Sequence, residues 1–317
     1  MSHQTSGSEG RWERETLEKL VFETLREQRS QRRWRMFLRL LWLAVLAALI
    51  WLVYRSGQLT PAPSTPHTAV VEMRGVIASD SEANAEQVIG SLRAAFEDSG
   101  SRGVVLLIDS PGGSPVQAGI INDEIHRLKA LHGKPIYAVV GDTCASAAYY
   151  VASAADAIYV NKASIVGSIG VLMDGFGFTG LMDKLGIERR LMTAGENKAF
   201  LDPFSPQDAE QRAYIQGMLD EIHRQFIEVV RKGRGDRLKE DDGIFSGLIW
   251  SGQQAVGLGL ADGLGTLDSV AREVIQQEDI VDYTQRENFG MRLVRRLGAG
   301  IGEGMANAAV GAGLQLR

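Results

Sequence analysis

The sequence predicts an α/β protein with a largely parallel sheet, preceded by one helix that spans a membrane. From residue 69 onward, short apolar runs alternate with amphipathic stretches, which is typical of strand–helix repeats in a parallel sheet. The run VVLLID at 104–109 is apolar enough for a strand that is covered on both faces. A longer apolar run at 36–54 stands apart from this alternation and predicts the membrane helix.

The predicted strands and helices follow one another in a regular order. Apolar runs predict strands at 69–77, 104–109, 135–140 and 157–160. Amphipathic periodicity predicts helices at 81–98, 116–131, 146–155 and 207–233. In folds of this kind ligands gather at the carboxyl ends of the strands, so the segments that follow the strands are candidates for a site.

The apolar run reads MFLRLLWLAVLAALIWLVY, and Arg39 is its one charged residue. As a helix its nineteen residues are about 28 Å long, close to the hydrocarbon thickness of a bilayer. About 35 residues precede it, which is longer than the amino-terminal region of most cleaved signal peptides. Arginines cluster before the run, so the positive-inside rule predicts a cytoplasmic N-terminus and an extracytoplasmic main domain.

The composition divides the chain into five parts. The predicted parts are a cytoplasmic segment at 1–35, the anchor at 36–54, a linker at 55–68, the main domain at 69–275 and a tail at 276–317. The linker is polar and holds three of the eight prolines, which is typical of a stiff, exposed connection. The tail fits either a flexible segment or a helix on the membrane surface, and the sequence leaves both open.

Charge and composition argue against several classes of function. The net charge of −5 gives no basic footprint for a nucleic-acid partner. Cys144 is the one cysteine, so no intramolecular disulfide forms. The five histidines show no metal-ligand spacing, and neither a metal nor a cofactor is predicted.

Two segments that follow predicted strands carry candidate site residues. SPGG at 110–113 has two glycines, which turn the chain and let bare backbone approach a ligand. GDTCAS at 141–146 ends in Ser146, where a helix is predicted to begin. Taken alone, SPGG fits an ordinary turn and Ser146 fits a helix cap. Taken together, they fit a nucleophile beside backbone N–H donors.

A serine nucleophile needs a base that removes its proton. No histidine lies between 133 and 222, so lysine is the alternative base, as in the Ser-Lys variants of the catalytic triad. The candidates after the serine begin with Lys162, Lys184 and Lys198. The first two lie in a polar turn and an amphipathic helix, where a solvated role is expected. Lys198 lies in the non-periodic segment GENKAFLDPFSP, whose apolar residues could remove water from it.

Five ordered segments resemble the signal peptide peptidase family of bacterial membrane-anchored Ser-Lys proteases. They are SPGG at 110–113, GDTCASAAYYVASAAD at 141–156, VGSIGV at 166–171, GENKAFLDPFSP at 195–206 and GLIWSGQQAVGLGLADGLG at 247–265. The resemblance extends over about residues 69–275. The length is similar to that of the family's short form, which has one protease domain.

The resemblance implies a role for each candidate residue. It implies that Ser146 is the nucleophile and that Lys198 is the general base. Gly113 and Ala147 match positions whose backbone N–H groups form the oxyanion hole, and Ser168 matches a serine that orients the lysine. The implied fold is the spiral ββα fold shared with Clp protease and crotonases, and no cofactor is implied.

The resemblance also implies partners and a location. The expected substrates are apolar peptides, in particular the signal peptide remnants left after preprotein processing. The expected location is the bacterial inner membrane, with the protease domain on the extracytoplasmic side. Members of the short form assemble as homo-oligomers, so we expect this chain to do so. Whether Ser146 and Lys198 meet within one subunit or across two stays open.

Other functions on the same fold also fit parts of the sequence. A protease partnered with stomatin-like proteins, or a general protease of envelope quality control, shares the chemistry. A crotonase-type acyl-CoA enzyme would use the same glycine turns without a Ser-Lys dyad. A non-catalytic membrane scaffold would need neither Ser146 nor Lys198, and the presence of both argues against it.

Overall fold

The computed structural model describes residues 33–51, 65–239 and 243–286. The helix Arg33–Trp51 belongs to one unit of the chain, and Ala62–Glu287 forms a second, compact unit. Each unit is described by itself. Most of the predicted cytoplasmic segment, most of the linker and most of the predicted tail lie outside the described residues.

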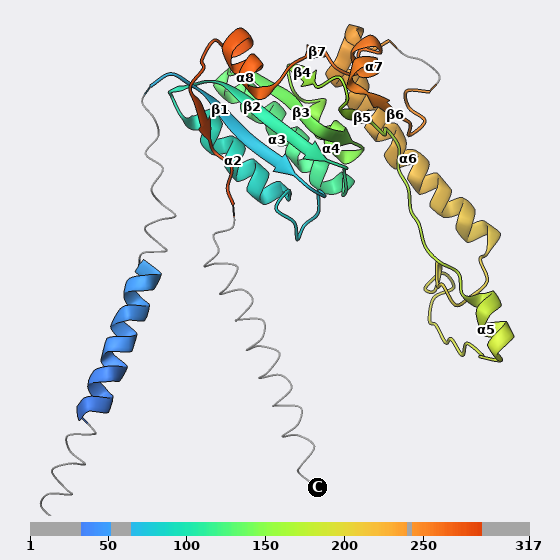
Figure 1. Ribbon diagram of the computed structural model, residues 1–317. Coiled ribbons are helices and arrows are strands. Elements are labelled where there is room, and N and C mark those ends of the chain that lie inside the picture. The colour runs from blue at the N-terminus through green and yellow to red at the C-terminus, as the bar shows by residue number, and fades with distance from the viewer. Residues whose placement is uncertain (1–32, 52–64, 240–242, 287–317) are drawn as a thin grey trace, which may run out of the picture. The chain divides into compact units, whose positions relative to one another are not determined.

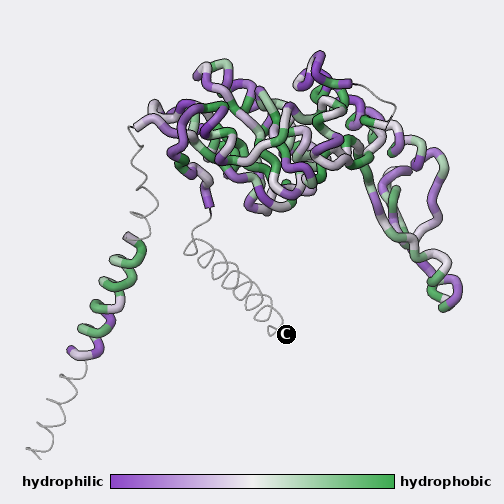
Figure 2. The backbone as a smooth tube through the Cα atoms, turned by 45° about the horizontal axis from the view of Figure 1, so that its top comes forward, coloured by the Kyte–Doolittle hydropathy of each residue, from purple (hydrophilic) through white to green (hydrophobic). Residues whose placement is uncertain are grey.

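The N-terminal helix is apolar along its length. Arg33–Trp51 contains nineteen residues and is long and apolar enough to cross a membrane. Its side chains are exposed throughout, and Figure 2 shows the helix as mostly hydrophobic, with hydrophilic residues in its lower part. The predicted apolar helix is therefore confirmed, and its described part already includes the three residues before the expected start at residue 36.

The compact unit is built on one eight-stranded sheet (Figure 1). The order of the path is β6-β5-β3-β2-β1-β8, while β4 pairs with both β3 and β7. The strands are β1 His67–Arg74, β2 Ser101–Ser110, β3 Ile136–Ala145, β4 Ala157–Val160, β5 Ile165–Gly167, β6 Ile249–Ser251, β7 Gly263–Leu264 and β8 Ile280–Asp282. Every pair is parallel except β5 with β6, so the prediction of a largely parallel α/β sheet is confirmed.

Helices connect the strands and cover the sheet. The α-helices are α2 Ala85–Glu97, α3 Pro115–His132, α4 Ala147–Ala152, α5 Thr179–Leu185, α6 Ala209–Arg234, α7 Gly252–Gly257 and α8 Leu267–Ser269. A 3-10 turn, η1, spans Gly235–Arg237, and a π-helical turn, η2, spans Val270–Ile275. The side chains of Asn84, Ser114 and Asp208 cap the N-termini of α2, α3 and α6, which explains where these helices begin.

The central strands are buried on both faces because their side chains alternate between two clusters. Val104, Leu106 and Ile108 of β2 point into the larger cluster, which contains residues of α2, α3 and α4. Val105 points to the opposite face, where it packs in a smaller cluster with Val270. This arrangement agrees with the uninterrupted apolar sequence of the strand.

A projecting segment, residues 173–219, leaves this body and returns to it. We call this segment the arm. It contains α5 and the N-terminal part of α6, and it contributes no strand to the sheet. Figure 1 shows it extending away from the sheet, with α5 near its end. None of the residues of α5 is buried.

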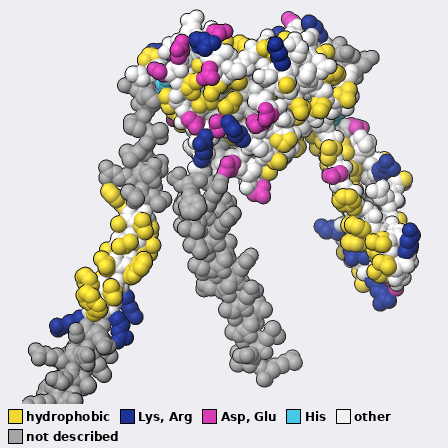
Figure 3. All heavy atoms as spheres, in the orientation of Figure 1, with side chains coloured by type: hydrophobic (Ala, Val, Ile, Leu, Met, Phe, Trp, Pro, Cys, Tyr) yellow, Lys and Arg dark blue, Asp and Glu magenta, His cyan; other side chains and the backbone are white. Residues whose placement is uncertain are grey.

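The surface of the arm is rich in exposed apolar side chains (Figure 3). Its exposed large apolar residues are Met173, Phe176, Phe178, Leu181, Leu185, Ile187, Leu191, Met192, Phe200, Leu201, Phe204, Tyr214 and Met218. Met192 and Phe176 are 95% and 81% exposed, respectively. An apolar surface of this extent is unusual for a monomer in water and is typical of an interface.

Two predicted boundaries differ from the structure. Strand β3 continues to Ala145 instead of ending at residue 140, because Thr143, Cys144 and Ala145 pair with β5. The compact unit extends past the predicted boundary at residue 275, because β8 pairs with β1. Neither pairing has a local sequence signal, since both strands are only three residues long at the point of contact.

Candidate active site

Ser146 lies at a sharp bend between β3 and α4. Its backbone angles are φ 54° and ψ −126°, a conformation that residues with a side chain rarely adopt. The backbone N–H of Ser146 donates a hydrogen bond of 2.8 Å to the carbonyl oxygen of Gly167, so β5 helps to hold the bend. Strain of this kind costs about 1–3 kcal/mol and persists only where the surroundings fix it.

The side chain of Ser146 does not cap the helix that follows. Ser146 occupies the N-cap position of α4, yet its hydroxyl makes no capping hydrogen bond. The interpretation of Ser146 as an ordinary helix cap is therefore wrong. Because the hydroxyl is not used for capping, it is available to the cavity that Ser146 lines.

The SPGG segment is held directly against this serine. Ile77 donates its backbone N–H to the oxygen of Gly112 at 2.8 Å and accepts one from Ser114 at 2.7 Å. A Cβ on Gly112 would lie 2.7 Å from the Cβ of Ser146, and a Cβ on Gly113 would lie 2.1 Å from the oxygen of Ile77. Both glycines also have positive φ, so a side chain at either position is excluded by space and by conformation.

The backbone N–H groups of Gly113 and Ala147 are free of protein partners. Among the described residues, none accepts a hydrogen bond from either group. Both residues line the same cavity as Ser146. A pair of unoccupied N–H groups beside a serine hydroxyl is the arrangement that stabilises the oxyanion of an acyl-transfer reaction.

Ser168 also lines this cavity, in a second unusual conformation. Its φ is 53°, and its backbone N–H donates to the oxygen of Leu248 at 2.8 Å. The preceding Gly167 is the residue that accepts from Ser146. The structure thus brings together four of the five predicted site residues, and their chemical roles stay predictions.

The cavity has a volume of about 550 Å³ and mostly apolar walls. Its lining residues are Pro111, Gly113, Pro115, Ser146, Ala147, Tyr150, Ser168, Gly170, Val171, Leu172, Ile222, Gln225, Phe226, Ser246 and Gly247. The rings of Tyr150 and Phe226 pack together with centroids 5.3 Å apart. None of these lining residues is Lys, Arg, His, Asp or Glu, so within the described part of the chain no basic side chain lines the cavity beside the serine.

Lys198, the predicted base, lies on the arm and away from the cavity. Its side chain is exposed, and the neighbouring Asn197 contacts Gln211 of α6 at 3.4 Å. The cavity lining on the same helix begins at Ile222, eleven residues further along. At the helical rise these positions are about 16 Å apart, so the structure does not bring Lys198 to the Ser146 of its own chain.

Two supporting contacts had no signal that sequence reasoning could use. Ile77 fixes the glycine loop through backbone groups alone, which any residue type provides. His223 of α6 contacts the backbone oxygen of Ile169 through its Nε2 at 3.1 Å and so holds the segment beside Ser168.

Cys144, two residues before Ser146, is buried, and burial raises the pKa of its thiol. This agrees with a packing role for the cysteine.

Comparison with known proteins shows which family the chain resembles. The model of peptidase family S49 matches residues 129–281. A putative protease of Methanocaldococcus jannaschii is 34% identical over 234 residues, which cover 72% of this chain and 75% of that protein. A putative signal peptide peptidase, SppA, of Enterococcus faecium is 29% identical over 222 residues, covering 68% and 64%.

A third relative carries a different name. A protein of Brucella melitensis named Na(+)/H(+) antiporter NhaA is 45% identical over 184 residues, which cover 58% of this chain. The matched region is 25% of that protein, so the chain spans about a quarter of its length. The name describes the Brucella protein as a whole.

Proposed function

The chain belongs to peptidase family S49, and from this premise we propose that it is a serine endopeptidase with Ser146 as its nucleophile. The observation that carries the proposal is the bend at Ser146, whose free hydroxyl lies beside two unoccupied backbone N–H groups. Membership of the family favours peptide hydrolysis over the acyl-CoA chemistry of crotonases. We also infer that the sheet and its helices form the spiral fold of Clp protease and the crotonases.

The proposed reaction begins when Ser146 attacks the carbonyl carbon of a peptide bond. A base removes the hydroxyl proton, and the carbonyl oxygen becomes an oxyanion that accepts from Gly113 and Ala147. The tetrahedral intermediate collapses to an acyl-enzyme when the base returns the proton to the leaving amine. Water then enters by the same route, and the second product leaves as a carboxylic acid.

We propose that the base is Lys198 of a neighbouring copy of the chain. The cavity holds no basic side chain of its own, whereas Lys198 is exposed on an arm covered with apolar residues. Assembly that buries the arm would remove these residues from water and carry the lysine into the next subunit's cavity. An apolar cavity disfavours the ammonium form of a lysine, which is what a general base requires. Ser168 would then hydrogen-bond to the lysine and orient it.

The cavity supports a preference for apolar peptide segments. Val171, Leu172 and Ile222 offer aliphatic contacts near the serine, and no described lining residue would pair with a charged side chain. Signal peptide remnants have this chemistry, and we propose them as substrates. The helix Arg33–Trp51 would anchor the protein in the bacterial inner membrane, with its N-terminus in the cytoplasm.

The experiment compares three variants on a fluorogenic apolar peptide. We expect Ser146→Ala and Lys198→Ala each to lose activity by about 10⁴-fold or more while staying folded. Lys184→Ala is the matched control, because Lys184 is another exposed lysine of the arm, and it should keep its activity. Activity in Ser146→Ala would refute the nucleophile, and activity in Lys198→Ala would refute the base.

Mixing the two inactive variants tests whether the lysine acts between chains. In a ring with head-to-tail contacts, a random one-to-one mixture of Ser146→Ala and Lys198→Ala chains pairs an intact serine with an intact lysine at about a quarter of its sites. We therefore expect about a quarter of the activity of the unmodified protein. A mixture that forms mixed assemblies and stays inactive would place the dyad within one chain.

A further inference from the structure

Helix α6 connects the arm to the body and is its main rigid support. It spans 26 residues, about 39 Å in length. Of its residues on the arm only Ile215 is buried, whereas Phe226, Val230 and Arg234 are buried towards its C-terminal end. These three residues recur at intervals of four, so they form one stripe along the helix. The body therefore holds α6 by its C-terminal third.

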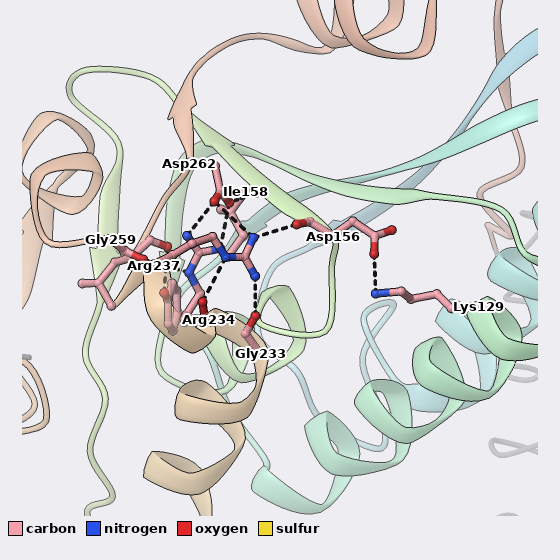
Figure 4. A network of polar contacts seen from close by, with 10 residues as sticks. Lys129, Asp156, Ile158, Gly233, Arg234, Arg237, Gly259 and Asp262 are labelled. Carbon is pink, nitrogen blue, oxygen red and sulfur yellow. Dashed lines mark hydrogen bonds and ion pairs between the residues drawn. The ribbon is translucent and has the colours of Figure 1, made fainter. Parts of the chain in front are cut away.

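The last residue of this stripe is a charged one that is nevertheless almost completely buried. Arg234 is 1% exposed, and its two terminal nitrogens donate to the two carboxylate oxygens of Asp262 at 2.7 and 2.9 Å (Figure 4). Its Nε donates to the backbone oxygen of Gly259 at 2.8 Å. A guanidinium bound at three points cannot rotate or slide without breaking a bond, so it fixes the direction of the helix end as well as its position.

Asp262 is held in turn by the sheet. The backbone N–H of Ile158 in β4 donates to its carboxylate at 2.7 Å, and Arg237 donates to it at 3.2 Å. Burial tends to raise the pKa of Asp262, but the hydrogen bonds from Arg234 and Ile158, with the charges of Arg234 and Arg237, outweigh burial and lower it. The pair is thus a charged connection between α6 and the strand β4.

A second residue extends the connection to α3. Arg237 also donates to the backbone oxygen of Asp156 at 2.7 Å. The carboxylate of Asp156 pairs with Lys129 of α3 at 2.7 Å (Figure 4). The C-terminal end of α6 is therefore tied both to the sheet and to one of the helices that covers it.

We propose that Arg234 and Asp262 are positioning residues for Lys198, acting through α6. The inference rests on the proposed transfer of the lysine to a neighbouring subunit. Gln211, which contacts the loop of Lys198, lies 23 residues before Arg234, or about 35 Å along the helix. A tilt of about 5° at Arg234 would displace that end of the arm by about 3 Å.

A displacement of this size is large compared with what proton transfer tolerates. A general base must lie within about 2.6–3.2 Å of the group whose proton it takes. A misplacement of 1 Å can cost about 10²-fold in rate. In this proposal the C-terminal end of α6 sets the distance between the lysine and the serine of the next subunit, although it lies far along the helix from the lysine.

The test places one substitution in either partner of the mixed assembly. Asp262→Asn keeps the shape of the side chain and weakens its bonds to Arg234. In one mixture it is added to the Ser146→Ala chains, which donate the lysine. In the other it is added to the Lys198→Ala chains, which donate the serine. We expect kcat to fall about tenfold or more in the first mixture and less than twofold in the second, with KM unchanged in both.

Two controls separate positioning from folding. Arg234→Lys is tested in the same two placements, because it keeps the buried charge and gives up the paired hydrogen bonds. Glu228→Gln, at an exposed position of the same helix, should leave both mixtures unchanged. Melting temperature and assembly size are measured for each variant chain, since a purely structural role would lower activity equally in both placements.

The outcomes separate this inference from the proposed function. A loss confined to the lysine-donating chains supports the positioning role. Equal losses in both placements, or a loss confined to the serine-donating chains, would overturn it. If the mixture without any change at Asp262 or Arg234 is already inactive, transfer of the lysine between subunits is wrong, and the inference falls with it.

Discussion

The body and the arm of this protein prepare the two halves of the proposed dyad in opposite ways. In the body, strand pairing and close glycine contacts hold Ser146 and its N–H groups rigidly within one chain. In the arm, Lys198 is exposed among apolar residues that a single chain leaves in water. The body is complete in backbone geometry and lacks a base, whereas the arm supplies a base and lacks a cavity. This difference is the basis of our proposal that the dyad forms between two chains.

Outside the dyad itself, the largest expected effect comes from the glycine loop of the body. Gly113→Ala places a Cβ where the oxygen of Ile77 lies, so the loop must move away from Ser146. We expect a loss of about 10²–10³-fold in kcat, as for removal of an oxyanion donor, measured on an apolar peptide. Gly119→Ala is the matched control, because its Cβ would be 4.0 Å from the nearest heavy atom, and it should keep full activity.

Replacing exposed apolar residues of the arm should weaken assembly without disturbing the fold. Phe176→Ser together with Met192→Ser removes two of its most exposed apolar side chains. We expect the assembly of this variant to dissociate at a higher protein concentration than that of the unmodified protein. Activity should fall with it by about tenfold. Sedimentation velocity and peptide hydrolysis measure the two effects. An unchanged assembly would show that these residues lie outside any interface.

The strained backbone at Ser146 predicts a smaller effect, a difference in stability between two substitutions of this residue. Ser146→Ala and Ser146→Gly should both abolish catalysis, but only glycine adopts φ 54° without a steric cost. We expect the glycine variant to be more stable than the alanine variant by about 1 kcal/mol in denaturant unfolding. Equal stability would mean that the bend at residue 146 is not strained.

Replacing a carboxylate of the body should alter the stability of the protein at acidic pH, whereas replacing one of the arm should not. The hydrogen bond from Arg127, with that from Arg93, lowers the pKa of Glu124 to about 2 despite its burial. Since this pKa is depressed, the stabilisation is present above pH 4.5 and is lost as the pH falls toward 2.

The measurement is unfolding by denaturant at a series of acidic pH values. Glu124→Gln should reduce the amount of unfolding free energy that is lost between pH 4.5 and about pH 2. Glu188→Gln should change it little, because Glu188 is an exposed carboxylate of the arm, where water screens its ion pair with Arg190. A pH profile that Glu124→Gln leaves unaltered would contradict the role given to its ion pairs.

Much of the body could be predicted from the sequence because its signals are local. Apolar runs located the long strands, and periodicity located the helices that cover them. The glycines of SPGG and the position of Ser146 indicated the cavity, since glycine is required where backbone segments approach closely. The short strands β5 and β8 escaped prediction because their positions depend on pairing partners far along the chain.

The arm could not be predicted in the same way. Its segment lacks regular periodicity, and a sequence does not show whether an apolar residue is buried in its own chain or exposed for another. Lys198 was identified by resemblance, yet its distance from Ser146 emerged only from the length of α6 and the exposed loop before it. The bonds of Arg234 had no sequence signal, because a lone arginine near a helix end is usually solvated.

The most direct test of the central claim measures which chain brings residue 198 to residue 146. In a Cys144→Ala background, Ser146→Cys and Lys198→Cys are introduced into one chain, and a short bis-maleimide bridges thiols that lie close together. We predict covalent dimers and larger ladders of chains on a denaturing gel, and none when either new cysteine is omitted. A cross-linked product that runs as a single chain would contradict it and place the lysine beside the serine of its own subunit.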